Sequence, residues 1–380
     1  MALAKRPRSS DHTGPTAHDN RKRFFLTMQT VILPTDTTDL TRQAVAQAVE
    51  LLRAGGIVAL PTETVYGLAA DALNPEAVAK VFGTKERPLF DPLIVHIGRA
   101  DYLESVAVIP EEIRKDINRL TQEFWPGPLT LILPKQPCVP DIVTAGLPTV
   151  AVRVSAHPVF TRVVRSLERP IAAPSANRFG RISPTSATAV LEELKGLIPL
   201  IIDGGACSFG LESTIVRVEP APEGKTRPLF HILRPGPITA EQLKEFGKVV
   251  KARPTAASES APEAPGMLSS HYAPTTPLRL VEKPEDFRPE PGKRYALLSY
   301  RGDAKDGFLD LHDWAEVVVL SPGAGKLPEA GVRFFYTLRQ LDRLGVDEII
   351  AEPVTEVGLG VAIMDRLRRA SVRSNGRVNA

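Results

Sequence analysis

Short apolar runs recur through the first two thirds of the chain, and segments with helical periodicity separate several of them. A short apolar run bounded by turn residues is typical of a buried strand, whereas apolar residues three and four positions apart indicate a helix with one buried face. Because alternating strands and helices build layered sheets, this pattern predicts an α/β domain. The expected strands are 31–33, 57–60, 93–97, 129–133, 149–154, 171–173, 200–202 and 214–218, and the expected helices are 41–53, 75–82, 156–167 and 185–197.

The composition changes near residue 251, where an Ala-, Pro-, Ser- and Glu-rich stretch without apolar periodicity is typical of a linker. Strands at 294–300, 315–320 and 348–351 then alternate with helices at 331–344 and 360–370, which predicts a small parallel, Rossmann-like sheet. A chain of 380 residues has room for two domains, since one domain usually has about 100–200 residues. We therefore expect a first domain at 28–250, a linker at 251–276 and a second domain at 277–380.

Residues 1–27 are basic, with six Lys or Arg residues against two Asp residues, a net charge of +4. The whole chain carries +3, so the remainder is nearly neutral, which argues against a protein that coats duplex nucleic acid. The segment is polar and aperiodic, and we expect it to be a disordered extension, with a start assigned too early in the sequence as the alternative. It lacks the apolar core of a signal peptide, and the chain has no run of about 18 apolar residues, so the sequence predicts a cytoplasmic protein without a membrane partner.

Several familiar sites are not indicated. Cys138 and Cys207 share no ligand spacing with the seven histidines, so neither structural zinc nor a disulfide framework is expected. Residues 323–326 resemble a phosphate loop, but Leu327 stands where a hydroxyl is required. Residues 358–360 lack the third glycine of a dinucleotide fingerprint. We interpret both glycine pairs as turns.

Two polar triplets carry the chemistry that the sequence does suggest. In the first, Lys85 offers a compact positive charge and Arg87 a planar fork of donors, a combination that suits a polyphosphate. In the second, Ser175 and Asn177 follow an apolar strand, and ligands in α/β domains dock at the carboxyl ends of strands. Each triplet has an ordinary alternative, a solvated loop for the first and a β-turn for the second.

Four more polar residues, Thr62, His96, Arg153 and Ser213, follow, end or precede apolar strands. One such residue would more often be a satisfied core or edge group, but four in one domain favour a shared pocket. Thr130 follows a rigid Pro- and Gly-rich turn, and its hydroxyl could reach a ligand bound in such a pocket.

These residues belong to a series of ordered motifs. The motifs are 61–68 (PTETVYGL), 85–88 (KERP), 92–96 (PLIVH), 125–130 (WPGPLT), 173–177 (APSAN), 233–236 (LRPG), 265–267 (PGM) and 271–274 (HYAP). Together they resemble the YrdC/Sua5 family of threonylcarbamoyl-AMP synthases, in its long Sua5 form. The resemblance implies a YrdC-like twisted-sheet domain with a large basic cavity, followed by a smaller Sua5 domain.

The resemblance also implies a reaction. An L-threonylcarbamoyladenylate synthase, a nucleotidyltransferase, converts L-threonine, bicarbonate and ATP to threonylcarbamoyl-AMP and pyrophosphate. The product serves t6A formation at position 37 of tRNA through a downstream t6A transferase machinery, and a contact with tRNA itself is one expectation. Mg²⁺ should accompany ATP, held mainly by phosphate oxygens and water rather than by protein ligands.

The family's site residues transfer motif by motif. Lys85 and Arg87 should be catalytic, binding the phosphates and stabilising the charge of the departing pyrophosphate. Asp91 stands where the family usually has Asn, and because an anion would repel phosphate we leave it out of the site, with a role on the metal side as the alternative. The other implied ATP-binding residues are Thr130, Ser175, Asn177, Ser183, Arg234 and Tyr272, and those implied for L-threonine are Thr62, His96, Arg153 and Ser213, with Arg153 as carboxylate partner.

Two other functions compete with synthesis. A non-catalytic module could use the same basic cavity to grip tRNA or double-stranded RNA, with an affinity that falls steeply with salt. Carbamoyl transfer, as in hydrogenase maturation proteins that contain a YrdC-like domain, is less favoured because zinc-finger and acylphosphatase-like segments are missing from the sequence. For the linker, the Pro and Gly residues of 265–274 and Tyr272 suggest a lid over the first domain's opening.

Overall fold

A mixed sheet of eleven strands forms the centre of the first domain in the computed structural model, which describes residues 28–251 and 262–372. The strand order is β1-β8-β2-β3-β7-β4-β6-β5-β9-β10-β11, with parallel and antiparallel neighbours. In chain order the strands are β1 (Val31–Pro34), β2 (Val58–Leu60), β3 (Gly67–Asp71), β4 (Ile94–His96), β5 (Leu129–Pro134), β6 (Thr149–Arg153), β7 (Ile171–Ala172), β8 (Leu200–Asp203), β9 (Thr214–Glu219), β10 (Leu229–Arg234) and β11 (Lys248–Lys251).

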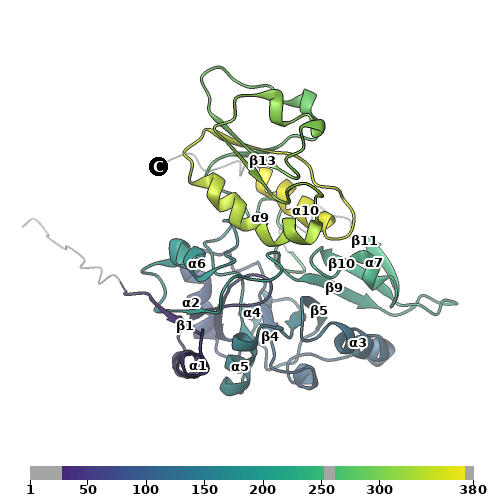
Figure 1. Cartoon of the computed structure of the whole chain (residues 1–380). Helices are drawn as coiled ribbons and strands as arrows, with labels where there is room; N and C mark the ends of the chain where they lie inside the picture. The colour runs from purple at the N-terminus through teal and green to yellow at the C-terminus, as the bar shows by residue number, and fades with distance from the viewer. Residues whose placement is uncertain (1–27, 252–261, 373–380) are drawn as a thin grey trace, which may run out of the picture.

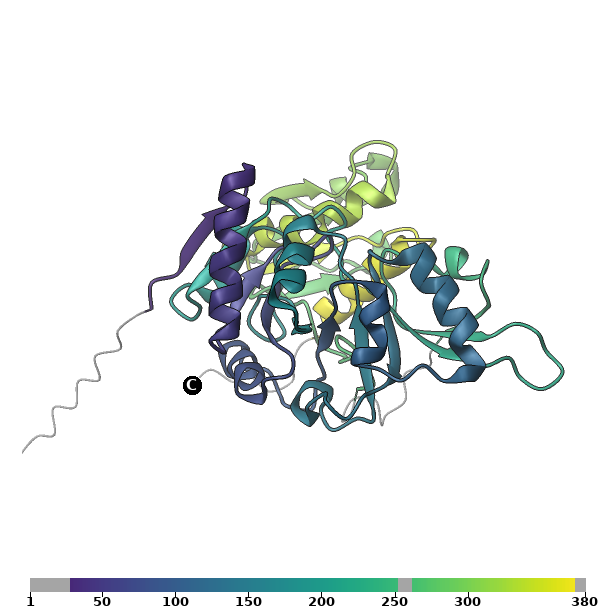
Figure 2. The ribbon, with the colours of Figure 1, turned by 90° about the horizontal axis from the view of Figure 1, so that it is seen from below.

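Helices cover this sheet, and α1, α3 and α5 lie on the side away from the second domain (Figures 1 and 2). Helix α1 starts earlier than the periodicity predicts because Thr37 caps it, its side chain accepting from the Leu40 amide. Its apolar face packs against α5. The helical segments are α1 (Thr38–Arg53), α2 (Pro75–Lys85), η1 (Ala100–Ser105), α3 (Glu111–Phe124), α4 (Asp141–Thr144), α5 (Pro158–Leu167), α6 (Ala187–Leu194) and α7 (Ala240–Leu243).

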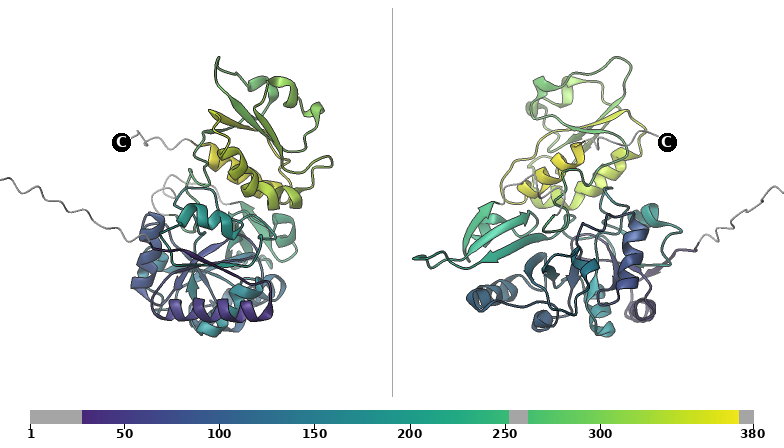
Figure 3. Two further views of the ribbon diagram at one scale, coloured as in Figure 1. Left: turned by 60° about the vertical axis from the view of Figure 1, so that its left-hand side comes forward. Right: turned by 180° about the vertical axis from the view of Figure 1, so that it is seen from behind.

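The second domain has a parallel sheet of four strands in the order β12-β15-β13-β14, which confirms the expected small parallel sheet. Helices α9 and α10 lie between this sheet and the first domain (Figures 1 and 3), so they face the first domain directly. The elements are β12 (Leu278–Leu280), η2 (Pro284–Asp286), β13 (Tyr295–Ser299), η3 (Ala304–Asp306), η4 (Leu309–Leu311), β14 (Glu316–Val319), α9 (Leu327–Asp342), β15 (Glu348–Ala351) and α10 (Gly360–Ser371).

The sequence pattern missed several elements. Strand β3 consists largely of Gly and Ala, which are weak strand signals, although all five of its residues are buried. Helix α3 carries its four apolar anchors among many charged residues, and β12 has only three residues. Helix α2 continues past Gly83 to Lys85, so Lys85 ends the helix instead of following it, which corrects the expected boundary.

Two expectations concern the ends of the chain and membranes. The expected disorder of residues 1–27 lies outside the described residues, as do parts of the expected linker and of the second domain's end. Among the helices that the structure describes, none has the length and apolar character needed to span a membrane.

Strand β4 organises the polar residues that the sequence singled out. It pairs in parallel with β6, in a register that sets His96 beside Arg153 at the carboxyl ends of both strands. It pairs antiparallel with β7, so residues that follow β7 run back toward the start of β4, and the Ala173 amide donates to the Ile94 carbonyl. One group of polar residues therefore gathers near the start of β4 and a second group near its end.

Candidate active site

A cavity of about 50 Å³ lies between the first domain and the segment 265–272. Its wall contains all four residues expected for L-threonine and four of those expected for ATP. The lining residues are Thr62, Thr64, Val65, Gly67, Arg87, Ile94, His96, Arg153, Ala173, Pro174, Ser175, Glu212, Ser213, Arg234, Pro265, Gly266, His271 and Tyr272.

Four expected residues do not line the cavity: Lys85, Thr130, Asn177 and Ser183. Each of them contacts, or is close in sequence to, a residue that lines it. The Thr130 hydroxyl is 2.8 Å from the Ser213 hydroxyl, and the Ser183 hydroxyl donates to Glu212 over 2.5 Å. These residues support the wall of the cavity in this structure instead of facing into it.

Lys85 joins the two triplets. Its ammonium group, at the end of α2, donates to the Ser175 carbonyl over 2.5 Å and also to the Asn177 carbonyl. Burial, and secondarily the nearby Arg87, lower the pKa of Lys85 well below its ordinary value. The Asn177 amide donates to the Arg178 and Arg181 carbonyls and so holds the loop that carries these acceptors.

Arg87 is held in one direction by the residues that follow it. Its Nε donates to the Asp91 carbonyl over 3.1 Å, and its Nη2 donates to the Pro92 carbonyl over 2.8 Å. Nη2 also lies 2.9 Å from the Asp91 carboxylate, and both side chains are buried. Burial raises the pKa of Asp91, and Arg87 and Lys85 oppose that shift. Asp91, which the sequence interpretation left out of the site, therefore pairs with Arg87 and orients it.

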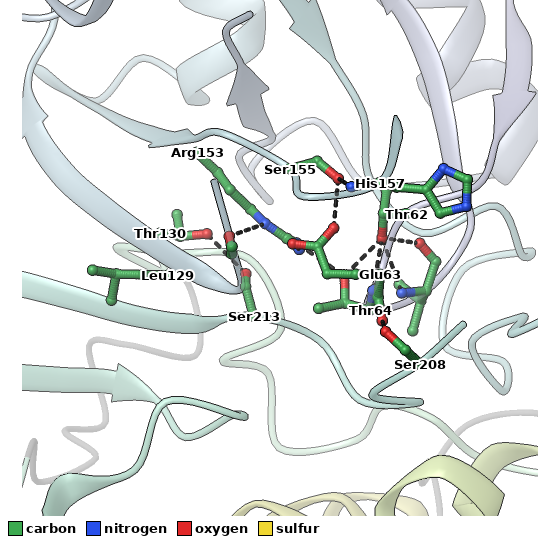
Figure 4. Close-up of polar contacts among 12 residues, drawn as sticks. Thr62, Glu63, Thr64, Leu129, Thr130, Arg153, Ser155, His157, Ser208 and Ser213 are labelled. Atoms are coloured by element: carbon green, nitrogen blue, oxygen red, sulfur yellow. Dashed lines mark hydrogen bonds and ion pairs between the residues drawn. The ribbon is translucent and has the colours of Figure 1, made fainter. Parts of the chain in front are cut away.

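Arg153 has the same kind of support at the other end of β4 (Figure 4). Its Nη2 lies 2.6 Å from the Glu63 carboxylate, and its Nη1 donates to the Thr64 hydroxyl over 2.9 Å. The Ser155 hydroxyl donates to the second Glu63 oxygen over 2.5 Å. Burial alone would raise the pKa of Glu63, but Arg153 and Ser155 outweigh it and lower the pKa to about 2. The pair is therefore charged at neutral pH.

The remaining polar groups near Arg153 are uncharged. Burial, with a further contribution from Arg153, lowers the pKa of His96 to about 3, so its imidazole is neutral at pH 7. The Thr62 hydroxyl donates to the Val65 carbonyl over 2.6 Å and lies 2.8 Å from the Thr64 hydroxyl. This part of the cavity offers one fixed cation among neutral donors and acceptors, a suitable environment for a small zwitterion.

The segment 265–272 closes the cavity. Arg234 donates to the Ser213 carbonyl over 3.1 Å and to the Pro265 carbonyl over 3.3 Å. Tyr272 is 1% exposed and has a left-handed backbone conformation, and a Cβ added at Gly266 would lie 2.6 Å from the Tyr272 hydroxyl. Sites for drug-sized ligands have about 300–1,000 Å³. The large basic cavity that the resemblance implies is therefore mostly filled here by the chain itself.

Three charged residues of this region, Glu63, Glu212 and Arg366, have no role assigned from the sequence. Glu63 and Glu212 are adjacent in the sequence to residues that do have a role, and a carboxylate beside a pocket with several cations indicates an ion pair. Arg366 is far away in the sequence, but it lies on the apolar face of α10, where a charged residue is unexpected. Its ion pair with Glu212 brings the second domain to the site.

Comparisons with known proteins agree with this geometry. A family model described as "Telomere recombination" matches residues 50–236, and one described as "Threonylcarbamoyl-AMP synthase, C-terminal domain" matches residues 238–372. The threonylcarbamoyl-AMP synthase of Pyrococcus abyssi is 41% identical over 338 residues, 85% of this chain and 93% of the relative. That of Bacillus subtilis is 39% identical over 363 residues, 92% of this chain and 97% of the relative.

Solved structures give the same result. P. abyssi Sua5 complexed with L-threonine superposes with a TM-score of 0.73 at 38% identity, covering 90% of this chain and 98% of that one. A doubly substituted variant of the same protein gives a TM-score of 0.77 with 90% and 96% coverage. The match therefore includes both domains, and the chain belongs to the threonylcarbamoyl-AMP synthase family in its long, Sua5 form.

Proposed function

We propose that this synthase binds ATP near the start of β4 and L-threonine near its end, so that the two substrates meet within one cavity. The observation that carries the proposal is the placement of two oriented arginines along β4. Arg87 is fixed by Asp91 at one end, and Arg153 is fixed by Glu63 at the other. A polyphosphate and an amino-acid carboxylate both need such fixed, planar donors.

For ATP, we assign the phosphates to Arg87 and Arg234, with Lys85 adding positive charge from behind the Ser175 carbonyl. Ser175, Asn177, Ser183 and Thr130 shape the wall that holds the nucleotide, and Tyr272 closes over it. Burial lowers the pKa of Arg234, as it does that of Lys85. A polyanion that enters the site would relieve this unfavourable burial of like charges, which favours its binding.

For L-threonine, we assign the carboxylate to Arg153 and the side chain and amine to the neutral groups of Thr62, His96 and Ser213. The threonine amine then attacks CO₂ and loses a proton, or attacks bicarbonate with loss of water, and an oxygen of the resulting carbamate attacks the α-phosphorus as the bond to pyrophosphate breaks. The protein supplies position and positive charge, since neither step needs a side-chain nucleophile. Arg87 stabilises the negative charge that develops on the leaving pyrophosphate.

We propose that Mg²⁺ enters with ATP and is held by phosphate oxygens and water. Glu212 is the one carboxylate that lines the described cavity, and both of its oxygens already contact partners, Ser183 and Arg366. The bound ion would offset phosphate charge during the attack. The product would then serve t6A formation on tRNA through a downstream transferase.

Incubation with ATP, Mg²⁺, bicarbonate and each amino acid in turn tests the proposal. We expect pyrophosphate release with L-threonine at least about 100 times faster than with L-valine, because a site that hydrogen-bonds a hydroxyl discriminates against an analogue without one. The control omits bicarbonate. Pyrophosphate release that does not depend on threonine would overturn the assignment.

We also propose that the segment 265–274 is the lid suggested by the sequence, and that it must move before ATP enters. Gly266 has a positive φ of 76°, and a side chain there would meet the Tyr272 hydroxyl, so Gly266→Ala should destabilise the closed position by about 1 kcal/mol or more. We expect faster amide hydrogen exchange across 265–272 and an ATP affinity about fivefold higher. Gly292→Ala is a control, since Gly292 also has a positive φ but no atom within 4 Å of an added Cβ. Unchanged exchange at 265–272 in Gly266→Ala would contradict the lid.

A further inference from the structure

Helix α10 carries an arginine on its buried face. Arg366 is 0% exposed and lies on the same face as Ala362, Ile363 and Ala370, which pack into the second domain's core. An arginine cannot lose its charge in a protein, so its burial is tolerated only where nearby groups compensate the charge. The helix faces the first domain (Figure 1), where Glu212 pairs with Arg366, and Asp365 of the same helix lies 3.2 Å from the Arg366 Nη1.

Arg366 contacts two residues of the active-site wall, Glu212 and Tyr272, and one residue next to it, Pro235. Its Nε lies 3.2 Å from the Glu212 carboxylate, and its Nη1 donates to the Pro235 carbonyl, next to Arg234. Its guanidinium carbon lies 5.5 Å from the centre of the Tyr272 ring. Although burial would lower the pKa of Arg366, Tyr272, Glu212 and Asp365 together raise it. The second domain thus inserts one permanent cation beside the ATP half of the cavity.

Glu212 explains what this cation does. It lines the cavity, and its other oxygen accepts from the Ser183 hydroxyl over 2.5 Å. Its neighbour Ser213 receives two hydrogen bonds from Arg234, through the carbonyl at 3.1 Å and the hydroxyl at 3.0 Å. Burial lowers the pKa of Arg234, and Tyr272 and Glu212 oppose that shift, so the Glu212 charge acts on Arg234. Without Arg366, Arg234, on which the Glu212 charge already acts, would be left to balance Glu212.

We propose that Arg366 is a positioning residue of the ATP site: it pairs with Glu212 and thereby leaves the Arg234 guanidinium available to the triphosphate. The inference rests on the proposed placement of ATP beside Arg234. It assigns to the second domain a direct part in substrate binding, because the cavity of the first domain alone contains an uncompensated carboxylate. Charge balance between Glu212 and Arg366, and not the mere presence of a long side chain at 366, is the property that matters.

Three variants of the full chain test the proposal: Arg366→Gln, Arg366→Lys, and the double variant Glu212→Gln/Arg366→Gln. In Arg366→Gln the unpaired carboxylate should engage Arg234 and repel phosphate, so the KM for ATP should rise at least about tenfold while the KM for threonine changes less than about threefold. In the double variant, the uncharged amide introduced by Glu212→Gln still accepts from Ser183, and the KM for ATP should return to within about threefold of the wild-type value. Arg366→Lys keeps the charge and should bind ATP more tightly than Arg366→Gln.

The matched control is Arg339→Gln. Arg339 is another buried arginine of the second domain that enters the first, where it contacts Glu193 at 2.9 Å and the Ile182 carbonyl, but it does not line the cavity. Its replacement should lower the melting temperature without the tenfold change in the KM for ATP. If Arg366→Gln matches the wild type in its KM for ATP, or if the double variant binds ATP no better than Arg366→Gln, the proposal is wrong.

Two safeguards keep the test decisive. If Arg366→Gln does not fold, the double variant and Arg366→Lys still test the proposal. Weak ATP binding by a folded double variant would overturn it. Titration of each variant with ATP alone, without threonine, separates binding from turnover. A wild-type protein that releases no threonine-dependent pyrophosphate would instead refute the proposed function, an outcome distinct from failure of Arg366 alone.

Discussion

Replacing Arg87 by Met should lower kcat/KM for ATP by about 100- to 1,000-fold and leave threonine binding nearly unchanged. The expected size is that of a preorganised donor to developing negative charge, here the charge on departing pyrophosphate. Three contacts with Asp91 and Pro92 fix the direction of the Arg87 guanidinium before any substrate arrives. Steady-state pyrophosphate release, with ATP and threonine varied separately, measures the effect.

The controls for this prediction separate geometry from charge. Arg87→Met leaves the buried Asp91 carboxylate without its ion-pair partner, so the double variant Asp91→Asn/Arg87→Met shows how much of the loss comes from that unpaired charge. Arg87→Lys keeps a positive charge but loses the planar set of guanidinium N–H donors. We therefore expect an activity between those of the wild type and Arg87→Met. A double variant with full activity would show that Arg87 does not act on the phosphates.

Replacing Arg153 by Met should have the largest effect on stability in the domain, together with loss of threonine binding. The change leaves the Glu63 carboxylate buried at 5% exposure with only the Ser155 hydroxyl and backbone support, and breaking a buried pair in this way destabilises by about 3–5 kcal/mol. The KM for threonine should rise about 100-fold or more, because the carboxylate partner is removed. Chemical denaturation and threonine titration measure the two effects.

The double variant Glu63→Gln/Arg153→Met distinguishes these two roles of Arg153. It removes both charges, so most of the lost stability should return, whereas threonine binding should not. Recovery of threonine binding in the double variant would contradict the assignment of Arg153 to the substrate carboxylate.

The same pair predicts a pH dependence. The pKa of Glu63 is lowered to about 2 from its ordinary 4.5 in the fold, so its ionised form stabilises the protein above about pH 4.5. That contribution is lost as the pH falls toward 2. The difference in unfolding free energy between wild type and Glu63→Gln should therefore shrink as the pH decreases, and a difference that stays constant from pH 6 to pH 3 would show that the carboxylate is not charged in the fold.

The sequence predicted what depends on local pattern. Buried strands are short apolar runs, and polar residues at their ends stand out, so the sequence singles out Thr62, His96 and Arg153, which line one cavity in the structure. Parallel pairing of β4 with β6 then accounts for the approach of His96 and Arg153. The motif pattern also indicated the family, because ordered, chemically unusual triplets rarely occur together by chance.

What the sequence could not predict depends on pairing between distant residues. Nothing local shows that Asp91 orients Arg87 instead of repelling phosphate, since this depends on how the chain folds back after Pro88. Arg366 and Glu212 are 154 positions apart, and only the docking of α10 brings them together. Strand β3 was missed for a different reason, because its Gly and Ala residues pack closely against neighbours without showing strand propensity.

The closed segment over the cavity has a consequence for how affinities are compared among relatives. On the proposed placement of ATP, the segment 265–274 must move before ATP enters and can then close over it, so entry of ATP competes with the closed position of a part of the same polypeptide. The measured dissociation constant then equals the intrinsic one divided by the fraction of molecules that are open. If about 1% of molecules are open, the measured affinity is about 100-fold weaker than that of the same phosphate contacts in a chain without the segment. Two synthases with identical phosphate-binding residues can therefore differ widely in ATP affinity through the segment alone.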